Sequence, residues 1–286
     1  MRAILIALLF AASGPAAAQF DFGRIINKTI ETTKKFQEAN KEFSTEDEIA
    51  LGNGITAGVL GATRLHADAN LQRYVNRVGK WLAMHSDRAD LPWSFGVMDT
   101  ETLNAFAMPG GAVLLSHGLL KRLASEAELA GVLAHEIAHV VKKHQLSAIQ
   151  STLSSDVWAG MGKDAAGQAI GRRGGDAFGL KGAAANAGVE AVKSGVFLRP
   201  LDRGMEYEAD RMGVVIAARS GYDPYGLVAV LSMLAQAKGD GSGAAIFDTH
   251  PAASDRISEL EGFMPKVVER FASQPQVEAR FRQMVK

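Results

Sequence analysis

Residues 134–139 read Ala134-His135-Glu136-Ile137-Ala138-His139, a His-Glu-x-x-His motif within an apolar run. Ser125 and Glu128 precede it and form a capping box, which predicts a helix that begins at Glu126. Residues four apart in a helix are separated by about 40° around its axis, so the two histidines project from adjacent turns. The pair can therefore hold one metal ion.

Neutral imidazoles at this spacing suit zinc, and Glu136 lies beside them without having to be a ligand. Zinc lowers the pKa of a bound water from about 15.7 to about 7, and a neighbouring carboxylate can then take its proton. We expect Glu136 to take this proton. The alternative is that so short a pattern arose by chance on a surface helix, which the helix cap and a second motif make less favoured.

The second motif supplies a third ligand for a site with one zinc ion per chain. Residues 205–211 contain Glu206 and Asp210, four residues apart and on one face of a helix expected to start near Asp202 and to stop at Gly221. We assign Glu206 to the metal and expect Asp210 to accept a hydrogen bond from a ligand imidazole. Glu208 is expected to point elsewhere. Without a metal site, these carboxylates would form a solvated helix face.

The chain at this point resembles a known family. His135-Glu136-x-x-His139, Glu206-x-x-x-Asp210 and the upstream segment from Asn104 to Gly111 are similar to the HtpX-like and CAAX-prenyl-protease-like family of zinc metallopeptidases. The resemblance covers residues 44–261 approximately and is strongest to soluble periplasmic members with a secretion signal. It implies a gluzincin-type endopeptidase in which His135, His139 and Glu206 bind zinc and Glu136 is the catalytic acid/base. The chain lacks the clear spanning helices of the membrane-embedded members, so a prenylated or intramembrane substrate is not expected.

The N-terminal 43 residues are expected to lie outside the catalytic domain. Residues 1–18 have the charged, apolar and small-residue regions of a cleavable signal peptide, which predicts export to the periplasm. The chain contains no cysteine, so it is not expected to be a lipoprotein. Residues 19–43 predict an amphipathic arm. The arm is expected to pack on its own domain, with peripheral membrane contact as the alternative.

Composition favours one globular domain. The 286 residues are 47% hydrophobic, which is enough for one sizeable core, and we expect a single metallopeptidase domain over residues 44–286. A Gly/Ala-rich insertion over about residues 154–195 is expected to be a mobile cover over the cleft, a segment that meets the membrane, or an ordinary helical pair. Balanced charge, 31 basic against 31 acidic residues, gives no electrostatic reason to expect nucleic acid as a partner.

The predicted fold class is α+β, a mostly helical zincin-like domain with a small β-sheet beside the active-site helix. Strands are expected over residues 94–98, 103–108 and 112–115, with a turn at Pro109-Gly110-Gly111. Helices are expected from Thr45, which with Glu48 resembles a capping box, and over residues 69–84 and 225–238. At the end of the motif helix, Lys142, Lys143 and His144 are expected to complement the helix dipole.

One of the predicted strands is expected to bind substrate. It consists of Asn104, Ala105, Phe106, Ala107 and Met108. We expect it to be an edge strand that aligns an extended peptide by β-augmentation. The alternative is a buried hairpin that only supports the motif helix.

Two residues near the C-terminus are candidates for further roles. His250 is expected either to stabilise the developing oxyanion or to act as a fourth zinc ligand that keeps the enzyme latent; a purely structural histidine is the alternative. Arg256 is a weaker oxyanion candidate, with a salt-bridge role as its alternative.

The predicted function is zinc-dependent endopeptidase action on unfolded or misassembled cell-envelope proteins in the periplasm. The substrate class follows from the resemblance and from the signal, since no pocket residue specifies it. The competing function is a periplasmic chaperone or assembly factor that uses the same peptide groove with zinc mainly structural. Glu136 argues against that alternative, because zinc binding alone does not require it.

Overall fold

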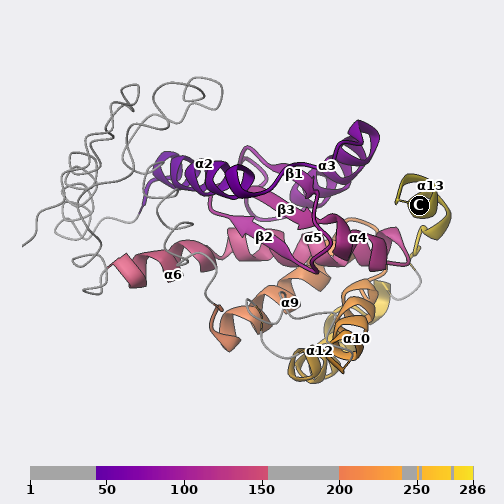
Figure 1. The fold of residues 1–286 in the computed structure, drawn as a ribbon. Helices are drawn as coiled ribbons and strands as arrows, with labels where there is room; N and C mark the ends of the chain where they lie inside the picture. The colour runs from indigo at the N-terminus through magenta and orange to yellow at the C-terminus, as the bar shows by residue number, and fades with distance from the viewer. Residues whose placement is uncertain (1–42, 154–199, 240–249, 251–252, 272–273, 286) are drawn as a thin grey trace, which may run out of the picture.

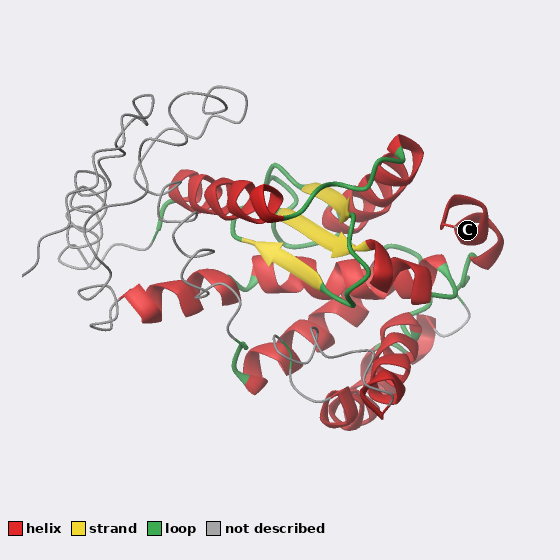
Figure 2. Ribbon diagram, viewed as in Figure 1, coloured by secondary structure: helices red, strands yellow, loops and turns green. Residues whose placement is uncertain are grey.

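The computed structural model describes residues 43–153, 200–239, 250, 253–271 and 274–285. Within this part of the chain the fold is mostly helical with a single three-stranded sheet, as Figure 2 shows, which confirms the expected α+β class. The expected signal peptide (1–18), the arm (19–43) except for its last residue, and the Gly/Ala-rich segment (154–195) lie outside the described residues.

The sheet contains the three expected strands, β1 (Ser94–Met98), β2 (Ala105–Met108) and β3 (Ala112–Ser116). Their order is β1-β3-β2, with β1 parallel and β2 antiparallel to the central strand β3. Two glycines form the tight β2–β3 turn, where Gly110 has a φ of 79° and Gly111 a φ of 106°. Glycine is favoured there because other residues rarely adopt positive φ.

The two faces of the sheet pack against different helices. Alternate residues, among them Met98, Met108 and Leu114, pack with helix α2 (Thr45–Ala62) in a small apolar cluster. Their neighbours, which point to the other face, join the main core with α3 (Ala69–Ala83) and α5 (Glu126–Val141). In Figure 1, α2 lies above the sheet and α5 below it. The motif helix is thus covered by the sheet.

The start of α2 corrects one expectation. Ser44, not Thr45, caps this helix, and its hydroxyl accepts a hydrogen bond from the Asp47 amide. Glu48 is instead fully buried, where its carboxylate binds the Arg88 guanidinium through both oxygens, at 2.8 and 2.9 Å, and accepts from the Gly110 amide. A buried carboxylate requires such partners, so the glutamate serves to tie α2 to the β2–β3 turn.

The motif helix α5 begins as expected at Glu126, with the Ser125 hydroxyl accepting from the Glu128 amide. The Glu128 carboxylate reaches back to the Ala124 amide, one residue before the usual capping-box partner. Glu126 itself is fully buried and accepts hydrogen bonds from Tyr74, Tyr222 and Arg280. These contacts anchor the N-terminal end of α5.

The remaining helices surround α5. They are α4 (His117–Arg122), α6 (His144–Leu153), α9 (Arg203–Arg219), α10 (Gly226–Gly239), α12 (Ala253–Val267), the short 3-10 helix η2 (Glu269–Phe271) and α13 (Glu278–Val285). Helix α9 begins after Asp202 and ends before Gly221, as expected, and it packs along α5. Among the described residues, none of these helices combines the length and apolar character needed to cross a membrane.

Candidate metal centre

The two motif histidines face each other on adjacent turns of α5. Their Nε2 atoms are 3.0 Å apart and both side chains are buried. When both imidazoles are neutral and both Nε2 atoms carry a lone pair, the two nitrogens cannot hydrogen-bond to each other. They can instead bind one cation between them. The i, i+4 spacing thus has the geometry expected from the sequence.

Helix α9 reaches this pair because it lies unusually close to α5. A Cβ atom at Gly213 would come within 3.0 Å of the His135 amide nitrogen. Glycine at this position therefore permits a helix–helix contact that a larger side chain would push apart. Glu206 lies seven residues before Gly213, near the start of α9, and its side chain points into the site.

Glu206 faces both histidines. Its Oε1 lies 3.5 Å from His139 Nε2, and its Oε2 lies 3.6 Å from His135 Nε2. Oε1 is buried without a hydrogen-bond partner among the described residues. Burial alone would raise the pKa of this carboxyl, but the imidazoles of His250, His139 and His135 hold it well below its usual range. The carboxylate is therefore charged, and one of its oxygens has unused binding capacity.

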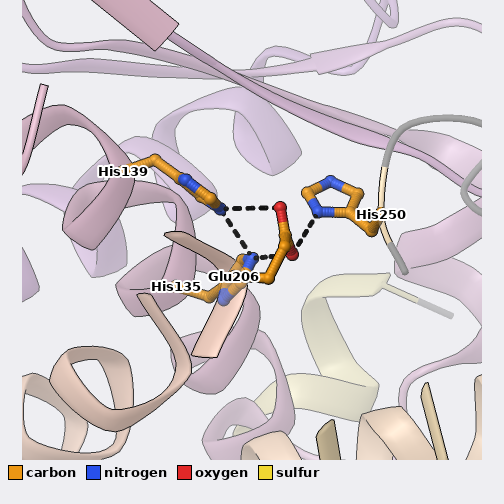
Figure 3. A group of neighbouring side chains, drawn as sticks. All are labelled: His135, His139, Glu206 and His250. Carbon is orange, nitrogen blue, oxygen red and sulfur yellow. Dashed lines mark hydrogen bonds and ion pairs between the residues drawn. The ribbon is translucent and has the colours of Figure 1, made fainter. Parts of the chain in front are cut away.

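His250 completes the group shown in Figure 3. Its Nδ1 lies 2.8 Å from Glu206 Oε2, and one ligand atom from each of His135, His139, Glu206 and His250 lies within 4.8 Å of the others. Burial would lower the pKa of His250, but the Glu206 carboxylate outweighs it and raises the pKa. Both roles considered for His250, oxyanion stabiliser and fourth zinc ligand, require it to lie inside this cluster.

These residues fit a metal ion. Three imidazole nitrogens and one carboxylate oxygen are a donor set typical of zinc, and the orphaned Glu206 Oε1 is an acceptor that a cation would satisfy. Imidazole ligands must be neutral, and burial holds the pKa of His139 well below its ordinary value. The cluster therefore has the chemistry to hold a metal ion, and its donor set is compatible with zinc.

Glu136 is buried next to the cluster but offers no ligand atom to it. Burial raises the pKa of its carboxyl. Together with His250 and Arg256, it borders a recess of about 30 Å³ whose other walls are largely apolar. The apolar walls are formed by Ala105, Leu119, Val132, Leu227, Val230, Leu231 and Leu234. A carboxyl group in this setting is well placed to exchange a proton with a molecule in the recess.

Asp210 and Arg256 support His135 from behind. Asp210 Oδ1 lies 2.9 Å from His135 Nδ1, and Arg256 binds both carboxylate oxygens, at 2.6 and 2.7 Å. The nearby Arg256 guanidinium outweighs burial and holds the pKa of Asp210 well below its usual range. The geometry places Arg256 chiefly in a salt bridge, the alternative to the oxyanion role considered for it.

The sequence interpretation missed the support of the second histidine. His139 Nδ1 lies 3.0 Å from His144 Nδ1, and His144 Nε2 lies 3.2 Å from Glu208 Oε2. The expectation that Glu208 points away from the site is therefore wrong, because Glu208 contacts the site through the ring of His144. His144 is buried and lies in α6, so its role is not that of a charge at the end of α5. The one available signal was a histidine five residues after the motif.

The candidate substrate strand β2 forms one edge of the three-stranded sheet. Its residues Ala105 and Ala107 face α5, and Ala105 borders the recess beside Glu136. Phe106 and Met108 belong to the opposite face, against α2. Asn104 precedes the strand, and its backbone N–H donates to the Ser116 hydroxyl. Among the described residues β2 is thus an edge strand of the sheet, with Ala105 close to Glu136.

The chain matches the model of peptidase family M48 over residues 69–264, more than half of its length. It is 31% identical over 232 residues to the beta-barrel assembly-enhancing protease of Yersinia pestis and 30% identical over 231 residues to that of Escherichia coli (strain K12). Both matches cover 77% of this chain. It is also 33% identical over 197 residues, 68% of the chain, to the mitochondrial metalloendopeptidase OMA1 of Schizosaccharomyces pombe.

This chain spans about half the length of these relatives, 44% of each bacterial protein and 53% of the yeast protein. The matched region contains both motif helices and His250. The names of the relatives and of the family support a metalloendopeptidase, which confirms the kind of family expected from the two motifs. The chain belongs to peptidase family M48.

Proposed function

We propose that this chain is a zinc-dependent endopeptidase with His135, His139 and Glu206 as the metal ligands. The observation that carries the proposal is the convergence of these side chains, from two helices distant in sequence, on one buried point. When bound, zinc would act as a Lewis acid that polarises a peptide carbonyl and makes water a stronger acid. Glu136 lies beside this point with no ligand role of its own.

Glu136 is the proton carrier of the proposed reaction. Its carboxylate accepts a proton from the attacking water and then donates it to the nitrogen of the leaving amine. Burial raises the pKa of this carboxyl, which brings its proton affinity closer to what transfer in both directions needs. The largely apolar recess at Glu136 gives a small apolar side chain of the substrate a place beside the reacting bond.

His250 is proposed to regulate this reaction as a fourth ligand that keeps the enzyme latent. Its Nδ1 lies against Glu206, and one of its ring nitrogens is within reach of the other donors, which is the position that a fourth ligand would occupy. A site with four protein ligands has no open position, as in structural zinc sites. His250→Ala distinguishes the roles, because increased cleavage supports latency and a loss of about 100-fold supports oxyanion stabilisation.

The proposed substrates are unfolded or misassembled proteins of the cell envelope, cleaved in the periplasm. The name of the bacterial relatives, beta-barrel assembly-enhancing protease, supports an envelope role, and the signal-like residues 1–18 support export. An extended peptide would pair with edge strand β2, where Ala105 is next to the recess. The arm is proposed to pack on its own domain, with peripheral membrane contact as the alternative. Balanced charge gives no electrostatic reason to propose a nucleic-acid partner.

Metal analysis paired with casein hydrolysis tests the proposal. Wild-type protein should contain one zinc per chain and cleave casein, and Glu136→Gln should keep the zinc and lose at least about 100-fold in rate. Glu259→Gln, an exposed carboxylate change on α12, serves as the control and should change neither. Undiminished cleavage by Glu136→Gln would contradict the mechanism. If that variant loses cleavage but retains its biological role in cells, the chaperone alternative is favoured instead.

A further inference from the structure

The helix breaks just after the metal-binding motif. Helix α5 ends at Val141, and Lys143 has a φ of 56°, a left-handed conformation that a lysine rarely adopts. In an unbroken helix, a residue five positions after His139 would lie about 140° away around the axis. Because of the break, a new helix, α6, begins at His144, and the ring of His144 lies against the ring of His139.

The His144 ring is in the middle of a series of polar contacts that runs outward from the site. His144 lies between His139, at 3.0 Å, and Glu208, at 3.2 Å. The second oxygen of Glu208 is 2.7 Å from Lys142 Nζ. The exposed fraction of the side chain rises along the way, from 5% for His144 to 42% for Glu208. Lys142 and Glu208 border a surface pocket of about 320 Å³.

Metal binding fixes which ring nitrogen of His139 and of His144 carries the proton in this series of contacts. His139 directs Nε2 toward His135 and Glu206, and a ligand nitrogen carries no proton, so the proton of His139 must be on Nδ1. His139 Nδ1 then donates to His144 Nδ1, which must be the unprotonated nitrogen of that ring. The proton of His144 is consequently on Nε2, where it donates to the Glu208 carboxylate. No other arrangement gives each contact one donor and one acceptor.

We propose that His144 is a positioning residue that holds His139 in the tautomer and orientation needed for zinc binding, with Glu208 orienting His144 in turn. The inference rests on the proposed zinc site and goes beyond its ligand set. An imidazole does here what a carboxylate usually does behind a zinc-bound histidine. The relay also links the buried ligand to an ion pair at the surface.

The experiment measures zinc affinity by competition with a chelator for the wild-type protein, His144→Leu, His144→Asn and Glu208→Gln. In the zinc-loaded proteins, the ¹⁵N chemical shifts of the His139 ring report which nitrogen carries the proton. Circular dichroism and thermal unfolding check folding. Glu259→Gln is the matched control for Glu208→Gln, because its side chain is 50% exposed and is also paired with a cation, Arg211.

We expect His144→Leu to lower zinc affinity by about 10- to 100-fold and to change the His139 signals. In His144→Asn, the amide oxygen can take the place of Nδ1 as acceptor, so this variant should recover most of the affinity. Glu208→Gln should lose a few-fold and Glu259→Gln nothing.

Two results would overturn the inference: unchanged affinity and unchanged His139 signals in His144→Leu, or equal losses in folded Leu and Asn variants, which would indicate packing alone. If His144→Leu does not fold, Glu208→Gln decides, and an affinity equal to that of Glu259→Gln overturns the relay. A wild-type protein that fails to bind zinc would instead refute the proposed function.

Discussion

The two motif histidines are supported in different ways. His135 donates directly to Asp210, which is 1% exposed and bound through both oxygens by the buried Arg256. His139 reaches its carboxylate only through His144, and that carboxylate, on Glu208, is 42% exposed and paired with Lys142. One support is a short, buried ion pair between α9 and α12, and the other is a longer relay that ends at the surface.

The difference teaches where each support should matter. A buried ion pair loses far more when one partner is removed than a surface pair does, because the remaining charge is left without water or counterion. The support of His135 should therefore contribute to folding and to metal binding together. The support of His139 should act mainly on metal binding, since water can stabilise its outer charges.

The largest effect is expected for Asp210→Ala. This change leaves the Arg256 charge buried and removes the acceptor of His135, so the free energy of unfolding should fall by about 3–5 kcal/mol and zinc affinity by about 10- to 100-fold. Chemical denaturation and chelator competition measure the two quantities. Asp255→Ala, at an exposed aspartate of α12 that lies near Arg203, is the control. A loss no larger than that of the control would remove the contrast between the supports.

An intermediate effect is expected at Lys143, whose backbone conformation turns His144 toward the site. Lys143→Val should destabilise the protein by about 1–2 kcal/mol, because a β-branched residue disfavours positive φ, and should weaken zinc binding. Lys143→Gly accepts this conformation and should leave zinc affinity unchanged. Thermal unfolding and chelator competition compare the pair. Equal zinc affinities for the two variants would show that the turn does not control His144.

The smallest effect on the metal is expected for Arg280→Gln, at the opposite end of α5. Burial alone would raise the pKa of Glu126, but hydrogen bonds from Arg280, Tyr74 and Tyr222 hold it below its ordinary value. A carboxyl with a lowered pKa stabilises the fold above its unfolded-state pKa, about 4.3, and this contribution is lost as the pH falls.

The variant should accordingly lose about 1 kcal/mol at pH 7, a value kept small because Arg280 is largely exposed. The difference from wild type should shrink as the pH falls below about 4. Denaturation curves between pH 3 and 7 check this. Zinc affinity at pH 7 should not change. A large loss of zinc binding would mean that any destabilisation of α5 mimics the effects predicted at the site.

The sequence predicted those parts of the molecule that depend on local spacing. Helix α5, helix α9, the three strands and the glycine turn follow from capping, periodicity and backbone preference, and the i, i+4 pairs place His135 with His139 and Glu206 with Asp210. Ser44 and Glu48 show the limit. The position of the cap was wrong by one residue, because a buried contact between Glu48 and Arg88 determines the role of the glutamate.

The relay from His139 through His144 to Glu208 also depends on contacts that no local pattern indicates, so it could not be predicted from the sequence. It depends on a left-handed residue at Lys143 and on the distance between α5 and α9, which Gly213 permits. Neither is encoded in a local pattern, since lysine gives no signal of positive φ and a glycine within a helix has many causes. Contacts between segments distant in sequence therefore had to come from the structure.

The most direct test of the account is anomalous diffraction at the zinc edge from crystals of the zinc-loaded protein. We expect one zinc per chain, bound by the Nε2 atoms of His135 and His139 and by a Glu206 oxygen, each at about 2.0–2.2 Å, with a ring nitrogen of His250 as the fourth ligand in the latent state. A zinc ion elsewhere, or a Glu206 carboxylate turned away from the ion with no other oxygen donor in its place, would contradict it.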